Sequence, residues 1–160
     1  MLVKNIASLI ASRRLALLAL VLTLALVLAV GCASGPPFVA PEPPAAGRAV
    51  VYVYREAKVL GAGVVHDVRV GMRPVGRMVN GGYKRVEVAA GTVSVYARSC
   101  EPAAAVVRLG AGEVGYVHLA LVNKTVEIGG RYYWDYSCRL AVRSETEALA
   151  VLPGLRLVAD

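Results

Sequence analysis

Residues 49–55 read Ala49-Val-Val-Tyr-Val-Tyr-Arg55, a run of β-branched and aromatic side chains that predicts the first strand of a sheet. Similar short runs follow as far as Val142, and glycine-rich turns separate them. The expected strands cover residues 49–55, 64–70, 75–78, 83–88, 92–98, 104–109, 114–122 and 132–142. About seven to nine short strands at regular spacing indicate an all-β fold, a single antiparallel β-sandwich.

Two glycine-containing turns predict hairpins. Ala89-Ala90-Gly91 suits a three-residue loop with Gly91 in the left-handed conformation. Gly129-Gly130 lies between two strand-like runs and suits a two-residue hairpin turn.

The C-terminal end of the chain departs from the strand pattern. Ser144-Glu-Thr-Glu147 matches a capping box, in which Ser144 caps the first turn and Glu147 reaches back. Apolar residues follow it until Pro153-Gly154. This pattern predicts one short helix, over about residues 145–152, packed on the sheet.

The first 32 residues have the layout of a bacterial lipoprotein signal. Lys4, Arg13 and Arg14 form a basic start, residues 15–30 are apolar apart from one threonine, and Gly31-Cys32 ends the run. A small residue before Cys32 lets a protease reach the bond, and the thiol is the nucleophile that takes up the lipid. We therefore expect residues 1–31 to be removed. Cys32 would then carry a diacylglyceryl group and usually a further acyl chain such as palmitate, enough for stable membrane attachment.

Two alternatives stay open for this leader. The apolar run of residues 15–30 is slightly shorter than a typical transmembrane helix, and it would serve as an uncleaved anchor if no protease cut it. Ser12-Arg13-Arg14-Leu15 resembles a twin-arginine export signal. Gly31-Cys32 favours cleavage, and the strongly apolar run favours ordinary export.

A lipidated Cys32 divides the chain into three parts: a removed signal over 1–31, a lipidated segment over 32–47 and a β-sandwich over 48–160. Residues 33–47 carry five prolines, which cannot join a sheet interior, and predict an undocked, semi-stiff tether. Ala33 follows the cysteine where an aspartate would oppose outer-membrane sorting. In a Gram-negative host we expect the protein at the outer membrane, facing the periplasm.

The charge pattern argues against a nucleic-acid partner. The formal net charge of +7 falls to +4 when the three basic residues of the signal are removed. The remaining basic residues are spread singly along the strands, without a dense run or aromatic interleaving. Such a surface has at most mild affinity for anionic lipid headgroups.

Several short motifs resemble a known family. They are Gly47-Arg-Ala-Val-Val-Tyr-Val-Tyr-Arg55, Val68-Arg-Val-Gly-Met-Arg-Pro-Val-Gly76, Asn80-Gly-Gly-Tyr83 and Val88-Ala-Ala-Gly91. Together they are similar to a family of small bacterial lipoproteins, domain of unknown function 2846, and to extracellular β-sandwich modules of the PEGA type. Ala90-Gly91 stands where the family usually has Pro-Gly. The resemblance spans about residues 47–140, and it implies a fold and a compartment but no catalytic residue.

Cys100 and Cys138 are the cysteines left after Cys32 is assigned to the lipid. An even count in an oxidising compartment favours a disulfide between them, and two separate, partly buried thiols are the alternative.

His66 and His118 lie inside expected strands without a neighbouring Cys or His at ligand spacing, so no metal site is expected. We find no catalytic triad, carboxylate pair or phosphate loop in the sequence, and we expect neither an enzyme nor a cofactor.

Tyr132-Tyr133-Trp134-Asp135-Tyr136 concentrates large polar-tipped rings. Strand alternation puts Tyr132, Trp134 and Tyr136 on one face, a candidate stacking surface for a glycan or a partner peptide. Tyr52 and Tyr54 would lie beside these rings. The alternative to a stacking surface is packing in the sandwich core, which the sequence favours. The leading hypothesis is a lipid-anchored, non-enzymatic binding or assembly module of the cell envelope. The second is a glycan-binding domain or small hydrolase centred on these rings.

Overall fold

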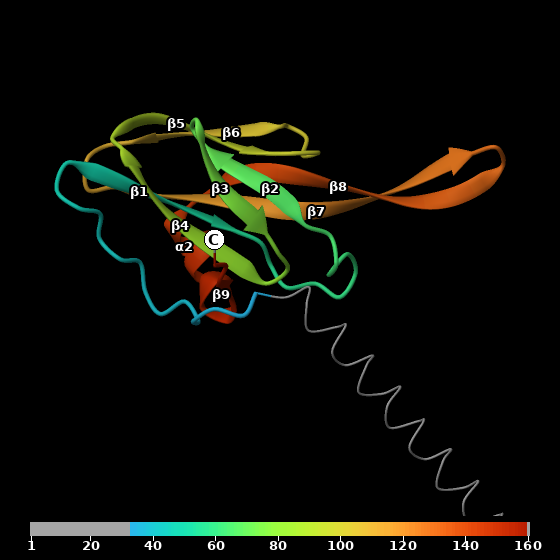
Figure 1. Cartoon of the computed structure of the whole chain (residues 1–160), viewed down its shortest axis with the longest axis horizontal. Helices are drawn as coiled ribbons and strands as arrows, with labels where there is room; N and C mark the ends of the chain where they lie inside the picture. The colour runs from blue at the N-terminus through green and yellow to red at the C-terminus, as the bar shows by residue number, and fades with distance from the viewer. Residues whose placement is uncertain (1–32, 160) are drawn as a thin grey trace, which may run out of the picture. The chain divides into compact units, whose positions relative to one another are not determined.

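The computed structural model describes residues 33–159. The predicted signal and Cys32 lie outside these residues. The described part is a two-sheet β structure with one short helix, as predicted (Figure 1). No helix in residues 33–159 is long and apolar enough to cross a membrane.

The larger sheet has the strand order β8-β7-β1-β4-β9 and the smaller one the order β3-β2-β5-β6. The larger sheet contains β1 (Arg48–Tyr54), β4 (Gly82–Ala89), β7 (Val114–Ile128), β8 (Arg131–Arg143) and β9 (Arg156–Leu157). The smaller sheet contains β2 (His66–Val70), β3 (Arg73–Met78), β5 (Gly91–Ala97) and β6 (Ala104–Leu109).

The larger sheet is mixed, which corrects the prediction of a purely antiparallel sandwich. β1 pairs antiparallel with β4 but parallel with β7, with Val50 opposite Val114 and Tyr54 opposite His118. β4 also pairs in parallel with the short strand β9, which the sequence did not predict. Between β4 and β7, which both belong to the larger sheet, the chain forms β5 and β6 of the smaller sheet. Residue alternation indicates which face a side chain takes but not which strand becomes the neighbour.

The predicted hairpin at residues 89–91 is wrong. β4 ends at Ala89 and β5 begins at Gly91, yet β4 pairs in the larger sheet and β5 in the smaller one. The chain therefore turns a corner between sheets at Ala90. Gly91 has a φ of 136°, a value that side-chain-bearing residues rarely adopt, so a glycine permits this corner.

Strand β1 is buried on both faces, which explains its unbroken apolar sequence. Ala49, Val51 and Val53 pack in the core between the two sheets. Val50, Tyr52 and Tyr54 face the other way, into a second cluster with residues of the C-terminal segment. The molecule thus has a third layer that covers the outer face of the larger sheet.

The proline-rich segment forms part of this third layer, which corrects the prediction of an undocked tether. The Phe38 ring packs edge-on against Tyr52 and Tyr83, with centroid distances of 5.6 and 5.4 Å. The amide of Phe38 donates to the carbonyl of Leu155 at 3.0 Å, and that of Gly35 donates to the carbonyl of Leu157 at 3.1 Å. Prolines prevent a full ladder, but they do not prevent docking through one aromatic side chain and a few amides.

The predicted helix is shorter than expected. Helix α2 covers Glu145–Leu149, and a 3-10 turn over Leu152–Gly154 follows it. The capping box is confirmed, because Glu147 donates its amide to Ser144 Oγ and its carboxylate accepts from the Ser144 amide at 2.9 Å. Ala148 and Leu152 are fully buried in the second cluster, so this segment packs on the sheet as predicted.

Candidate functional site

Strands β7 and β8 continue beyond the sandwich as a two-stranded hairpin. Their pairing extends from Tyr116 opposite Arg143 to Ile128 opposite Arg131. Residues beyond Leu121 on β7 and before Ser137 on β8 pair only with each other and are mostly exposed. Figure 1 shows this hairpin reaching past the other strands. We call residues 123–136 the arm.

The tip of the arm is the predicted Gly129-Gly130 turn. Both glycines have positive φ, 60° and 75° respectively, which is the combination that a type I′ hairpin turn requires. The prediction of a hairpin here is confirmed. Its strands are 15 and 13 residues long, well above the usual strand length of about five or six, and this length carries the arm away from the core.

The aromatic run lies on the arm, so the expectation that it packs in the sandwich core is wrong. Tyr132 and Trp134 are 73% and 71% exposed. They share one face of the ribbon with the half-buried Tyr136. Tyr52 and Tyr54 do not join them, since both are buried in the second cluster.

The opposite face of the arm is also partly apolar. Tyr133 lies opposite Val126, and Ile128 lies opposite Arg131. Tyr133 is 48% exposed and Ile128 is 63% exposed. The apolar side chains of the tip therefore surround it, and they do not form a single flat platform.

The carboxylates of the arm do not form a catalytic pair. Glu127 lies opposite Tyr132, whereas Asp135 lies opposite Lys124, so the two acids point to opposite faces of the ribbon. Hydrolysis by paired carboxylates requires both groups to converge on the same glycosidic bond, which two acids on opposite faces of a ribbon cannot do. This geometry gives the hydrolase hypothesis no support.

A disulfide fixes the root of the arm. Cys100, in the connection between β5 and β6, is bonded to Cys138 of β8, which confirms the predicted pairing. The amide of Glu101 donates to the carbonyl of Cys138 at 2.7 Å, and the Glu101 carboxylate lies 3.7 Å from Lys124 Nζ. These contacts tie the arm to the smaller sheet just where it leaves the sandwich.

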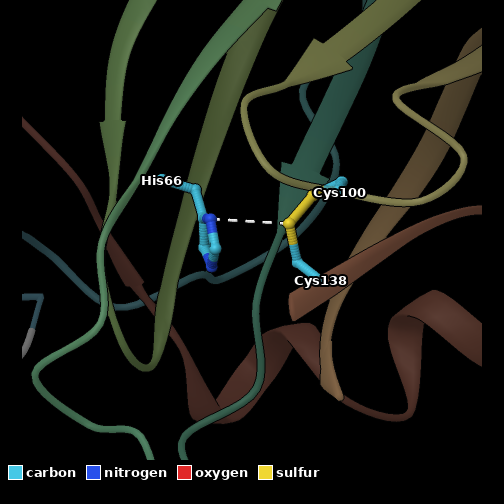
Figure 2. A group of neighbouring side chains, drawn as sticks. All are labelled: His66, Cys100 and Cys138. Carbon is cyan, nitrogen blue, oxygen red and sulfur yellow. Dashed lines mark hydrogen bonds between the residues drawn. A yellow bond between two sulfur atoms is a disulfide. The ribbon is translucent and has the colours of Figure 1, made fainter. Parts of the chain in front are cut away.

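The His66 imidazole lies against this disulfide (Figure 2). Its Nδ1 is 3.4 Å from Cys138 Sγ and 3.3 Å from the carbonyl oxygen of Arg98. A carbonyl only accepts hydrogen bonds, so this arrangement favours the proton on Nδ1. Burial lowers the pKa of His66, and the Arg98 hydrogen bond opposes part of that effect.

The sequence did not predict that His66, Cys100 and Cys138 would meet. Their ligand atoms lie within 4.8 Å of one another, a spacing that would suit a metal ion. A thiolate is the form of cysteine that binds metals, and neither sulfur can be a thiolate while the two are bonded together. In this state the cluster is a buried disulfide with a neutral imidazole beside it.

His118 occupies a second buried position, on β7. Its ring stacks on Tyr54 with a centroid distance of 5.0 Å, and its Nε2 lies 3.5 Å from a carboxylate oxygen of Glu56. Burial lowers the pKa of His118, and the Glu56 carboxylate opposes part of that effect. Both histidines are buried and packed, and among the described residues the Nε2 atom of each has no hydrogen-bond partner.

The connection between β1 and β2 forms an exposed apolar loop beside the arm. Val59 is 95% exposed and Leu60 is 66% exposed. Lys58, Val59 and Leu60 line a hollow of about 390 Å³ together with Leu121 and Asn123, at the root of the arm. Sequence reasoning missed this loop; its signal is a Val-Leu pair between Lys58 and Gly61, where a polar turn is usual.

No protein-family model, curated protein or solved structure matches this chain. The resemblance to domain of unknown function 2846 and to PEGA modules therefore stays a prediction.

Proposed function

We propose that this protein is a lipid-anchored component of the cell envelope that acts as a non-enzymatic binding or assembly module. The signal-like sequence ending at Gly31-Cys32 supports the anchor. The Cys100–Cys138 disulfide agrees with an oxidising compartment such as the periplasm. In a Gram-negative host the module would sit at the outer membrane.

The observation that carries the binding role is the arm. A two-stranded ribbon gains little stability from its own pairing in water, and this one leaves Tyr132, Tyr133 and Trp134 exposed. Exposed aromatic clusters are typical of interaction sites because such rings offer area and a hydrogen-bonding group. The disulfide at the root holds the arm in one orientation, which reduces the entropy lost on binding.

Photo-crosslinking in intact host cells tests this role. A photoreactive amino acid at Tyr132 of the full-length protein should capture an envelope component, which mass spectrometry can identify. The matched control carries the same group at Arg108, an exposed position on β6 of the other sheet. Equal capture from both positions, or none from Tyr132, would contradict a binding role for the arm.

The anchor has its own test in the same cells. We expect the unaltered protein to take up labelled palmitate and to lose its leader, and the Cys32→Ala variant to do neither. An unaltered protein that takes up no label and keeps an intact leader in the membrane fraction would argue for the uncleaved anchor instead.

Glycan binding is a second candidate for the same residues. Tyr132 and Trp134 lie two residues apart on one face, and both are more than two-thirds exposed, as stacking on sugar rings requires. Co-sedimentation with peptidoglycan should then be lost in Trp134→Ala and kept in Tyr96→Ala, which removes a less exposed ring on β5. Binding that is equal in both variants would reject this candidate.

A further inference from the structure

The first described residue is fixed to the body of the domain. The amide of Ala33 donates to the carbonyl of Asn80 at 3.1 Å, and Gly35 and Phe38 are also hydrogen-bonded to the C-terminal segment. Cys32 is the next residue toward the N-terminus, and consecutive Cα atoms lie about 3.8 Å apart. A lipid on Cys32 would therefore bring the Asn80 end of the domain directly to the bilayer, without a spacer.

The apolar loop lies at this same end. The side-chain oxygen of Asn80 accepts from the amide of Lys58 at 2.9 Å, and a Cβ placed on Gly81 would come within 3.2 Å of Ala57. The loop in turn lines the hollow at the root of the arm, with Leu121 and Asn123. Ala33, the loop and the arm root are thus consecutive neighbours on one end of the sandwich.

The loop exposes its apolar side chains although its backbone is held in place. The buried Arg55 guanidinium donates to the carbonyls of Gly61 and Val64, the former at 2.8 Å. Lys58 is held by Asn80, so both flanks of Val59 and Leu60 are hydrogen-bonded. Exposure of these two side chains is therefore a property of the folded loop and not of an unstructured segment.

The tip of the arm has the composition of a membrane-interface anchor. Tyr and Trp are enriched where bilayers meet water, because their rings are apolar and their N–H and O–H groups are polar. Tyr132 and Trp134 lie on one face of the tip, and Tyr133 and Ile128 lie on the other. A sugar or a peptide would cover one face, whereas the headgroup region of a bilayer surrounds an inserted tip on all sides.

The charges near these residues are mixed. Lys58, Lys124 and Arg131 are offset by the acids Glu127 and Asp135 at or near the arm. Strong attraction to anionic lipids needs a cluster of basic residues, so membrane contact through this surface would not require anionic lipids. Partition of the aromatic and aliphatic side chains into the headgroup region would supply the binding free energy, which would depend little on salt concentration.

We propose that the bilayer surface is the partner of the arm tip and of the apolar loop. Ile128, Tyr132, Tyr133 and Trp134 enter the headgroup region, and Val59 and Leu60 make a second contact beside the anchor. This inference rests on the proposed lipidation of Cys32. The lipid would hold the protein at the membrane, and the two apolar elements would fix which way the sandwich faces.

Trp134 allows a direct test because it is the only tryptophan in the chain. The full-length product is purified from host membranes and reconstituted in phosphatidylcholine vesicles, and its tryptophan emission is recorded. We expect a blue-shifted emission and strong quenching by lipids brominated near the headgroups. Quenching by acrylamide should be several-fold weaker than for the same protein unfolded in denaturant without detergent. The bromolipid quenching should persist at high salt.

Two rearranged variants provide the controls. In Trp134→Phe with Tyr96→Trp, the only tryptophan lies at a half-exposed position on β5, and we expect the same acrylamide quenching with and without vesicles and no quenching by bromolipids. In Trp134→Phe with Val59→Trp, the tryptophan lies in the apolar loop, and bromolipids should quench it. Equal bromolipid quenching at positions 96 and 134 would overturn the proposed orientation.

The failures of the two proposals are distinguishable. A protein that floats with vesicles while Trp134 stays open to acrylamide overturns this inference and leaves the anchor standing. A protein that does not float and carries an unmodified Cys32 overturns the anchor itself. Protection of Trp134 by peptidoglycan fragments, but not by vesicles, would assign the arm to a glycan and reject a bilayer partner.

Discussion

At the residue scale, Phe38 decides whether the proline-rich segment docks. Its ring is 6% exposed and fills the space between Tyr52 and Tyr83. We expect Phe38→Ala to lower the free energy of unfolding by about 3–5 kcal/mol, because it leaves a cavity and releases the segment. Urea denaturation measures the change. Val39→Ala is the matched control, since Val39 is 88% exposed, and its effect should stay within about 0.5 kcal/mol.

The Cys100–Cys138 bridge is the second residue-scale determinant. It joins positions 38 residues apart, and in the chain-entropy model a loop of this length contributes on the order of 3–4 kcal/mol. Replacing both cysteines by alanine should destabilise the domain by this amount in urea denaturation. A change in the free energy of unfolding below about 1 kcal/mol would show that the bridge contributes little to the stability of the sandwich.

The two buried histidines predict a specific pH dependence. Burial lowers the pKa of His66 and of His118 below the ordinary value of 6.5, so the unfolded chain binds more protons than the folded one in acid. The free energy of unfolding should therefore fall as the pH drops from about 7 to 5, by at most about 1.4 kcal/mol per pH unit for each histidine. His66→Asn keeps a donor for Arg98 and should flatten this slope. Identical slopes for the two proteins would contradict the assignment to His66.

At the element scale, the arm depends on its turn. Gly130 has a φ of 75°, and a β-branched residue there costs about 1–2 kcal/mol. We expect Gly130→Val to increase hydrogen exchange in the arm amides while the core strands keep their protection. Gly63→Ala is the control, because a Cβ added at Gly63 would have no atom within 4 Å and the φ of this residue is not in the positive range. Global loss of protection in Gly130→Val would mean that the arm is not an independent element.

The elements also show how far the sequence predicts this fold. The places of strands β1 to β8, the Gly129-Gly130 hairpin and the Ser144 capping box follow from local patterns and are confirmed, whereas β9 and the extension of β7 to Ile128 were not predicted. The corner at Ala90 could not be foreseen, because a short glycine-containing link suits either a hairpin or a crossing between sheets.

The candidate site was predicted only in part. The same-face alternation of Tyr132, Trp134 and Tyr136 is local and was predicted correctly. Their position outside the core depends on where β7 and β8 lose their neighbours, and that is set by the lengths of the other strands. The contact of His66 with the disulfide joins positions 72 residues apart, for which no local pattern exists.

At the scale of the whole molecule, the docked N-terminal segment, the apolar loop and the arm lie at the same end of the sandwich. The docked segment brings the chain to the Asn80 end, the apolar loop lies beside it, and the arm leaves from the same end. A lipid at Cys32 would turn this arrangement toward a bilayer. The Cys100–Cys138 disulfide holds the root of the arm against the smaller sheet.

Mass spectrometry of the protein purified from the membranes of its own host tests this arrangement most directly. We predict that the mature chain begins at Cys32 and that the mass of its first peptide includes a diacylglyceryl group on the thiol and an acyl chain on the amino group. An unmodified Cys32, within an intact leader or after cleavage at another bond, would contradict the anchor and the orientation derived from it.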